Sequence, residues 1–387
     1  MYHSLIGKPS LRVVLVMGLL IWLCSLLLLA ACGGKESAKG GADQEHNKKE
    51  IGSLRVENAS GDSAHCGQRC TLNSGQIAFG RRPEYDQPQS AIFAMNLDGS
   101  HVSQITHPPE GFRDDGPEWS ADGQRLAFVR QSDKSMSRIM VLNTKRGDAR
   151  QVVGVEGFDP AFSPDGDSLA FKRILGPDTD AKRIEGIWIV GLDGSTLHQV
   201  TNVEPKLPAA FSDSWPQFSP DGKMLVFERT RLEDTRHAVF VQSLDSSGSP
   251  EDAHQLTPWK MDCGITPEFS PDGKLVLFRC GAWMEAPSML WWVHPDGTGL
   301  HRLDKTGLEG SPVRSYLGSS FSPSFSGREG WITTTWFPCT SCSGPSVDVA
   351  DVFRVRIEDG DVVRTTNLTK SEMYESAPDW GTHQPVG

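Results

Sequence analysis

Short apolar runs alternate along the chain with turn-forming residues, and one such unit recurs several times. The clearest copy runs from Pro160 to Phe171, with a Ser-Pro-Asp-Gly tetrapeptide between two short apolar runs. Proline presets the backbone of such a turn, and Asp-Gly tolerates the positive φ of a hairpin corner. The unit therefore predicts two antiparallel strands joined by a tight turn.

The same hairpin signal returns in other parts of the chain. Complete copies run from Pro117 to Phe128, Pro216 to Phe227 and Pro267 to Phe278. A degenerate copy runs from Pro323 to Trp331, and the last, at Pro378 to Gly381, contains only a first strand. The longer units continue with a third strand, an Asp-Gly turn and a short fourth strand. Four antiparallel strands per unit, at a period of about 40 to 55 residues, indicate a β-propeller.

The two ends of the array complete one blade between them. The first expected strand, Gln76 to Phe79, matches the second strand of a unit, whereas Ala377 to Trp380 matches the first. Combining them gives six complete blades and removes the two sheet edges that an open array would expose. We therefore predict an all-β fold, a six-bladed propeller closed by pairing of the N- and C-terminal strands.

Residues 1–31 have the layout of a secretory signal peptide. Lys8 and Arg12 precede an apolar run from Val13 to Ala31, the order of a positive end followed by an apolar middle. The run ends in Leu-Ala-Ala-Cys-Gly, with the cysteine at position 32. This string resembles the lipobox of bacterial lipoproteins. The alternative is a plain transmembrane helix, because the run is just long enough to span a bilayer.

The lipobox resemblance implies that Cys32 carries a lipid anchor, with palmitate among its acyl chains. The chain would then lie outside the cytoplasm. Its anchor would be in the outer leaflet of a plasma membrane or on the periplasmic side of an outer membrane. Residues 32–63, which include this cysteine, form a flexible linker, since they hold too few apolar residues to bury a core.

Residues 64–387 are assigned to the propeller. The formal net charge of the whole chain is −11, which argues against nucleic acid as a partner. We expect a monomer that contacts the membrane through its lipid anchor.

The repeated string Phe/Trp-Ser-Pro-Asp-Gly-x-x-Leu-Ala-Phe resembles the blade motif of TolB-type, WD-repeat-like propellers. The resemblance covers about Gln76 to Gly381. It implies the propeller fold and says little about function, because one fold hosts many functions. TolB proteins also carry an amino-terminal α/β domain, and this chain has a linker in that place. Binding of a peptidoglycan-associated partner is therefore not implied.

Recognition is expected on the face of the propeller that carries the long loops. Loops after the first and third strands of each unit are tight, whereas loops after the second and fourth are long and varied, and binding residues concentrate on loops held by a rigid scaffold. The alternative for any single residue is structural: the acids would cap turns, and the tryptophan at position 215 would pack between blades. The candidate partner-binding residues are Arg113, Asp114, Asp115, Asp159, Asp213, Trp215, Asp262, Trp283, Trp336, Tyr374 and Glu375.

Six cysteines follow the lipobox, and an extracytoplasmic location favours disulfides among them. Cys263 and Cys280 flank one hairpin close to cross-strand register, so we predict a disulfide between them. The other four leave local pairs, pairs between the two clusters, and a zinc site open as alternatives. They are Cys66, Cys70, Cys339 and Cys342.

The sequence contains neither a Gly-x-Ser-x-Gly nucleophile motif nor a His-x-x-x-His metal pair. We therefore expect no cofactor and no metal, and a non-catalytic scaffold that binds an envelope protein or glycan. The alternative is a propeller enzyme, a polysaccharide lyase or glycosidase, with acids at the channel mouth. Asp114 and Asp115 would suit that chemistry, but neighbouring residues on a strand point to opposite faces.

Overall fold

The computed structural model describes parts of the chain from Gly75 to Gly381. The described residues are 75–83, 89–132, 135–152, 156–175, 184–201, 211–245, 253–280, 288–303, 314–315, 319–321, 325, 327–336 and 350–381. The predicted signal peptide 1–31, the linker 32–63 and the four cysteines Cys66, Cys70, Cys339 and Cys342 lie outside them, as does Trp283. None of the described residues forms a helix long and apolar enough to cross a membrane.

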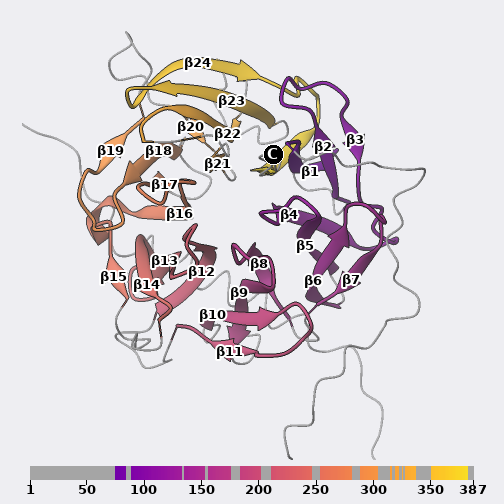
Figure 1. Ribbon diagram of the computed structural model, residues 1–387, viewed down its shortest axis with the longest axis horizontal. Helices are drawn as coiled ribbons and strands as arrows, with labels where there is room; N and C mark the ends of the chain where they lie inside the picture. Colours follow the sequence, from indigo (N-terminus) through magenta and orange to yellow (C-terminus); the bar gives the residue numbers. More distant parts are fainter. Residues whose placement is uncertain are drawn as a thin grey trace, which may run out of the picture. The chain divides into compact units, whose positions relative to one another are not determined.

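The described strands form six antiparallel sheets arranged as blades around an axis (Figure 1). We number the blades along the chain and give each from its inner strand outward. Blade 1 is β25 (Tyr374–Trp380), β1 (Ile77–Arg82), β2 (Ala91–Met95) and β3 (Ser103–Gln104). Blade 2 is β4 (Arg113–Trp119), β5 (Arg125–Ser132), β6 (Ser135–Asn143) and β7 (Ala149–Gln151). Blade 3 is β8 (Phe158–Phe162), β9 (Ser168–Leu175), β10 (Ile184–Gly191) and β11 (His198–Gln199).

The second half of the ring follows the same plan. Blade 4 is β12 (Phe211–Phe218), β13 (Met224–Arg231), β14 (Arg236–Ser243) and β15 (His254–Gln255). Blade 5 is β16 (Cys263–Phe269), β17 (Val276–Cys280), β18 (Ser288–Val293) and β19 (His301–Arg302). Blade 6 is β21 (Ser319–Phe321), β22 (Gly330–Trp336), β23 (Asp351–Glu358) and β24 (Asp361–Asn367). Two elements depart from the four-strand plan: β20 (Arg314–Ser315) also pairs with β18, and the short 3₁₀ helix η1 (Trp259–Met261) joins blades 4 and 5.

The predicted closure of the ring is confirmed. β25 pairs with β1 in antiparallel register, with Ile77 opposite Trp380 and Arg82 opposite Tyr374. The first described strand, β1, is therefore the second strand of blade 1, and the last, β25, is its first strand. Closure removes the sheet edges that an open ring would leave beside the axis.

The Ser-Pro-Asp-Gly turns are held by their own side chains. Ser163 Oγ donates to the Asp165 carboxylate at 2.6 Å and accepts the Ser168 N–H at 3.0 Å, while Gly166 adopts φ +73°. Ser120, Ser219 and Ser270 make the same two contacts in their turns. The recurring motif is therefore a hydrogen-bonded hairpin corner.

The apolar residues of the motif pack between blades. Phe162 and Phe171 of blade 3 share a buried cluster with Val141 of blade 2. Blades 5 and 6 meet through a cluster that contains Trp292 and Phe325. Such inter-blade packing explains why the motif recurs in units that share little other sequence.

The inner strands of blades 1 to 5 each carry a β-bulge immediately before a proline, where the pairing with the second strand changes register. The bulged residues have φ between +47° and +60° and are Gly116, Asp159, Trp215, Thr266 and Ala377. This conformation is strained for threonine and tryptophan. A bulge also bends its strand and redirects side chains, here next to the axis.

The strain at these bulges is testable at one glycine and one alanine. A methyl group on Gly116 would have no atom within 4 Å, so Gly116→Ala adds backbone strain alone and is expected to lower the free energy of unfolding by about 1–2 kcal/mol. Ala377→Gly is expected to raise it by a smaller amount, because glycine gives up more chain entropy on folding. Urea denaturation checks both, and shifts of the same sign would contradict a shared strained bulge.

Candidate functional site

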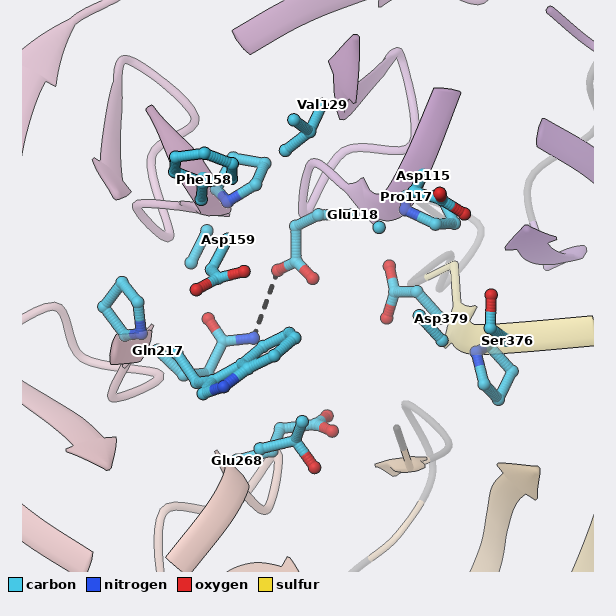
Figure 2. Close-up of a pocket in the computed structure, with 18 of the residues that line it drawn as sticks. Asp115, Pro117, Glu118, Val129, Phe158, Asp159, Gln217, Glu268, Ser376 and Asp379 are labelled. Atoms are coloured by element: carbon cyan, nitrogen blue, oxygen red, sulfur yellow. Dashed lines mark hydrogen bonds between the residues drawn. The ribbon is translucent and has the colours of Figure 1, made fainter. Parts of the chain in front are cut away.

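The five bulges surround a cavity of about 310 Å³. Each of the five blades contributes the same three positions to its wall: the bulged residue, the proline and the residue after the proline. The residues after the prolines are Glu118, Ala161, Gln217, Glu268 and Asp379. Figure 2 shows the side chains of Glu118, Gln217, Glu268 and Asp379 around one shared space.

The carboxylates in this cavity differ in their hydrogen bonds. Glu118 Oε1 accepts a hydrogen bond from Gln217 Nε2 at 3.1 Å (Figure 2). Asp379 Oδ2 accepts the backbone N–H of Trp119 at 2.6 Å, a contact that joins blades 1 and 2. Burial raises the pKa of Glu118 well above its ordinary value, and the nearby charges of Asp379 and Glu268 raise it further.

Acidic side chains outnumber basic ones along the cavity wall. Besides the three acids that follow prolines, Asp115 and Asp159 line the wall, and the cationic side chains there are Arg82 and Arg279. The ammonium of Lys172 lies 3.1 Å from the Asp159 carboxylate and compensates it. Within the described part of the chain, no three His, Cys, Asp or Glu side chains are arranged so that they could hold one metal ion together.

The apolar part of the wall is formed by prolines and aromatic rings. Phe158 and Trp215 line the cavity together with the prolines of five blades. The Lys172 ammonium lies 5.2 Å from the centre of the Phe158 ring and 5.9 Å from that of Trp215. These rings therefore already accept one cation from the protein itself. The arrangement suits a ligand with an apolar body and a positive charge.

The shifted carboxyl of Glu118 makes stability depend on pH. A carboxyl with a raised pKa in the folded state stabilises the fold below its unfolded-state pKa, and that contribution is lost as the pH rises through the folded-state value. Glu118→Gln is therefore expected to increase the urea midpoint near neutral pH and to leave it almost unchanged in acid. Glu358→Gln, at a side chain that is 53% exposed, is the control. If the urea midpoints of Glu118→Gln and wild type changed with pH in parallel, the raised pKa of Glu118 would be contradicted.

Three of the candidate residues from the sequence line the cavity: Asp115, Asp159 and Trp215. Asp115 lies directly after Asp114 on β4, and the two side chains point to different places, as expected for neighbours on a strand. Burial raises the pKa of Asp115, and Ser90 Oγ donates to its carboxylate at 2.8 Å.

Three other candidate acids are buried in ion pairs, so their carboxylates serve the fold. Asp114 binds Arg130 and Asp213 binds Arg229, each through two hydrogen bonds of 2.7 and 2.8 Å. Glu375 binds Arg81 at 2.7 Å. These pairs link the first and second strands of blades 2, 4 and 1, and the side chains of all three acids are 0% exposed. Sequence alone could not distinguish them from surface acids, because each follows a long loop.

The remaining candidates are spread over several environments. Tyr374 is fully buried, and the Arg82 guanidinium lies 4.3 Å from the centre of its ring. The Asp262 carboxylate accepts the backbone N–H of His237 at 2.9 Å. Arg113 begins β4 and is half-buried, and Trp336 ends β22. Neither Tyr374 nor Asp262 lines the cavity wall described above.

The predicted disulfide between Cys263 and Cys280 is present. The two residues are directly opposite each other on β16 and β17. Cys280 holds the same position on its second strand as Arg81, Arg130 and Arg229 hold on theirs. Blade 5 therefore has a covalent link where blades 1, 2 and 4 have ion pairs.

Sequence reasoning missed the residue that follows each proline. The signal was present, because the repeat places Glu118, Gln217, Glu268 and Asp379 between a proline and an aromatic residue. The aromatic packs between blades, so strand alternation sends its predecessor the other way, toward the axis. Aligning the copies by their prolines would have brought three acids to one position.

Comparisons with known proteins agree with this architecture. Residues 73–313 match the TolB beta propeller domain family, PD40. The solved TolB of Acinetobacter baumannii superimposes with a TM-score of 0.53 at 17% identity, over 79% of this chain and 66% of that one. The hydrazine synthase of Kuenenia stuttgartiensis gives a TM-score of 0.56 at 14% identity, over 81% of this chain and 48% of that one. Both likenesses concern the fold.

One curated relative is similar at the sequence level. "Uncharacterized peptidase YuxL" of Bacillus subtilis is 30% identical over an alignment of 199 positions that covers 42% of this chain. The matched part spans only 28% of that protein's length. The PD40 match, by contrast, extends over more than half of this chain and falls on the blades. The chain therefore belongs to the TolB β-propeller domain family.

Proposed function

We propose that the chain is a non-catalytic recognition propeller, tethered outside the cytoplasm through a lipid on Cys32, that holds a cationic side chain of a protein partner in its axial cavity. The observation that carries the proposal is the convergence of Glu118, Glu268 and Asp379 from three blades on one cavity. A lysine or arginine side chain entering there would meet three half-buried acids, and its charge would lower the raised pKa of Glu118 and favour the ionised form.

The size and lining of the cavity favour a peptide over a sugar chain. A volume of about 310 Å³ lies at the lower end of ligand-sized pockets. Its wall combines five prolines and the Phe158 and Trp215 rings with few uncharged polar groups. The acids of the wall would bind a cation more strongly than the neutral hydroxyl groups of a sugar, and an alkyl stem with a charged end fits both parts of the wall.

Partner capture tests the proposal with matched variants. The fragment from Gly33 onward, the triple variant Glu118→Gln/Glu268→Gln/Asp379→Asn and a control triple at exposed acids are compared in cross-linking pull-downs from envelope extracts and on glycan arrays. Asp148, Glu233 and Glu358 serve as the control positions, with side chains 53%, 46% and 53% exposed. We expect a protein captured by wild type and by the control but lost with the cavity triple. Capture that survives the cavity triple, or binding of a glycan alone, would refute the proposal.

A second candidate function is favoured by one observation. Glu118, with its raised pKa, and Asp379, which accepts a backbone N–H, are two carboxyl groups in contrasting environments within one cavity. Such pairs supply an acid and a base in glycosidases. Release of reducing sugars from envelope polysaccharides, abolished by Glu118→Gln, would support this function in place of recognition.

A further inference from the structure

The outer strand of blade 6 differs from those of the other blades. β3, β7, β11, β15 and β19 have two or three residues, whereas β24 has seven. Figure 1 shows β24 as the long strand at the rim of the ring, and it is the last strand of its sheet. No strand within the described ranges pairs with its outer edge. Short outer strands protect a sheet from further pairing, and β24 lacks that protection. A register shift beside Val363 interrupts β24, so its regular edge runs from Arg364 to Asn367.

Three arginines lie together on one face of this blade edge. Arg356 of β23 is directly opposite Arg364 of β24, and on its other side it is opposite Trp331 of β22. Like charges directly opposite each other destabilise a sheet. The guanidinium groups of Arg354 and Arg356 lie 4.2 and 5.7 Å from the centre of the Trp331 ring. The three cations thus share one surface.

The acids near this surface leave part of its charge uncompensated. Glu358 binds Arg356 at 3.2 Å, and it stands opposite Asp361 at the hairpin end, away from the middle of β24. Asp98 of blade 1 acts on Arg354 from across the blade interface, while burial and the charge of Arg364 lower the pKa of Arg354. Within the described residues, Arg364 has no ion pair, and Nε of Arg354 is buried without a hydrogen-bond partner.

We propose that blade 6 accepts an extended acidic segment of a partner protein as a fifth strand along β24, with a carboxylate against Arg364 and with the charges of Arg356 and Arg354 on the next strand adding to the attraction. The exposed edge supplies main-chain hydrogen bonds, the usual source of affinity in strand addition. Arg364 selects an acidic side chain at the position beside it in the added strand, and side chains two residues away lie on the same face. Val363, 43% exposed, offers an apolar contact at the same edge. This site is separate from the axial cavity and does not depend on it.

A labelled hexapeptide of alternating threonine and glutamate, with blocked ends, is the probe. Fluorescence anisotropy measures its binding to the propeller, beside a peptide with lysine in place of glutamate. Arg364→Glu is expected to weaken binding by about tenfold or more, and Arg364→Lys by much less. Arg146→Glu, the same charge change at a side chain that is 73% exposed in another blade, is expected to leave binding unchanged. Arg364→Gln provides a second loss of charge without an added acid.

Amide hydrogen exchange locates the bound peptide. Binding is expected to slow exchange in residues 361–367 and to leave the outer strands of the other blades unaffected. Three results would each overturn the proposal: equal binding of the lysine peptide, unchanged affinity in Arg364→Glu, and protection outside β24. A dimer that forms through β24 and excludes the peptide would also overturn it, since the edge would then belong to a second copy of the chain.

Discussion

Replacing Asp114 by alanine is expected to lower the free energy of unfolding by about 3–5 kcal/mol, because the buried charge of Arg130 would lose its partner. The two side chains are 0% and 1% exposed and are joined by two hydrogen bonds of 2.7 and 2.8 Å. Water cannot readily replace the lost carboxylate at that depth. The variant retains every other contact of the β4–β5 hairpin, so the effect reports on the ion pair.

Urea denaturation followed by tryptophan fluorescence measures this loss. Asp148→Ala is the matched control, because Asp148 pairs with Arg146 at the surface, where the side chains are 53% and 73% exposed. The control is expected to change stability by about 0–1 kcal/mol. The double replacement Asp114→Leu/Arg130→Met should recover much of the loss, since no unpaired charge remains. Equal effects of Asp114→Ala and Asp148→Ala would refute the buried pair.

Removing the disulfide of blade 5 is expected to cost about 3 kcal/mol, since the bond closes a loop with a sequence separation of 17 residues. Cys263 and Cys280 are 1% and 8% exposed and belong to the core between blades 4 and 5. The double variant Cys263→Ala/Cys280→Ala therefore tests the covalent link and its packing together. Substitution is preferable to a reducing agent, which would also act on the other cysteines.

Single and double replacements of these cysteines separate the bond from the side chains. Either single variant should lose nearly as much stability as the double variant, because one replacement already abolishes the bond. Additive losses would indicate that packing alone matters at these positions. Urea midpoints of the three variants and wild type provide the comparison.

The blades and their closure could be predicted from the sequence because the information is local and repeated. A Ser-Pro-Asp-Gly turn defines its hairpin wherever it occurs, and the unmatched strands at Gln76 and Trp380 determine how the ring closes. The disulfide followed from the same cross-strand register. Each of these features depends on residues within one hairpin or on the order of hairpins.

The cavity could be predicted only in part, because it depends on bulges and on contacts between distant blades. The bulge before Pro117 turns Glu118 toward the axis, and its partner Gln217 lies 99 residues further along the chain. The burial of Asp114 depends on Arg130 being in register across the hairpin. Hydropathy and charge patterns do not show which acids are buried in ion pairs, so acids in the core and acids in the cavity look alike until the copies are aligned by their prolines.

Belonging to the TolB β-propeller domain family does not determine the activity of the chain. A TolB propeller and a hydrazine synthase both share this architecture with the chain at low identity. Within the chain, the blades differ from one another in the side chain at one repeated position around the axis. The position holds three acids, one amide and one alanine in the five blades that line the cavity. We therefore expect the side chains at this position to determine what the cavity binds.

The most direct measurement is a calorimetric titration with two short peptides that differ only in charge, one with a central arginine and the other with citrulline, its uncharged near-isostere. We expect the arginine peptide to bind at least tenfold more tightly, which corresponds to about 1.4 kcal/mol. We expect this preference to disappear in Glu118→Gln/Glu268→Gln/Asp379→Asn. Equal affinity for the two peptides in the wild-type protein would contradict the cationic site at the centre of the propeller.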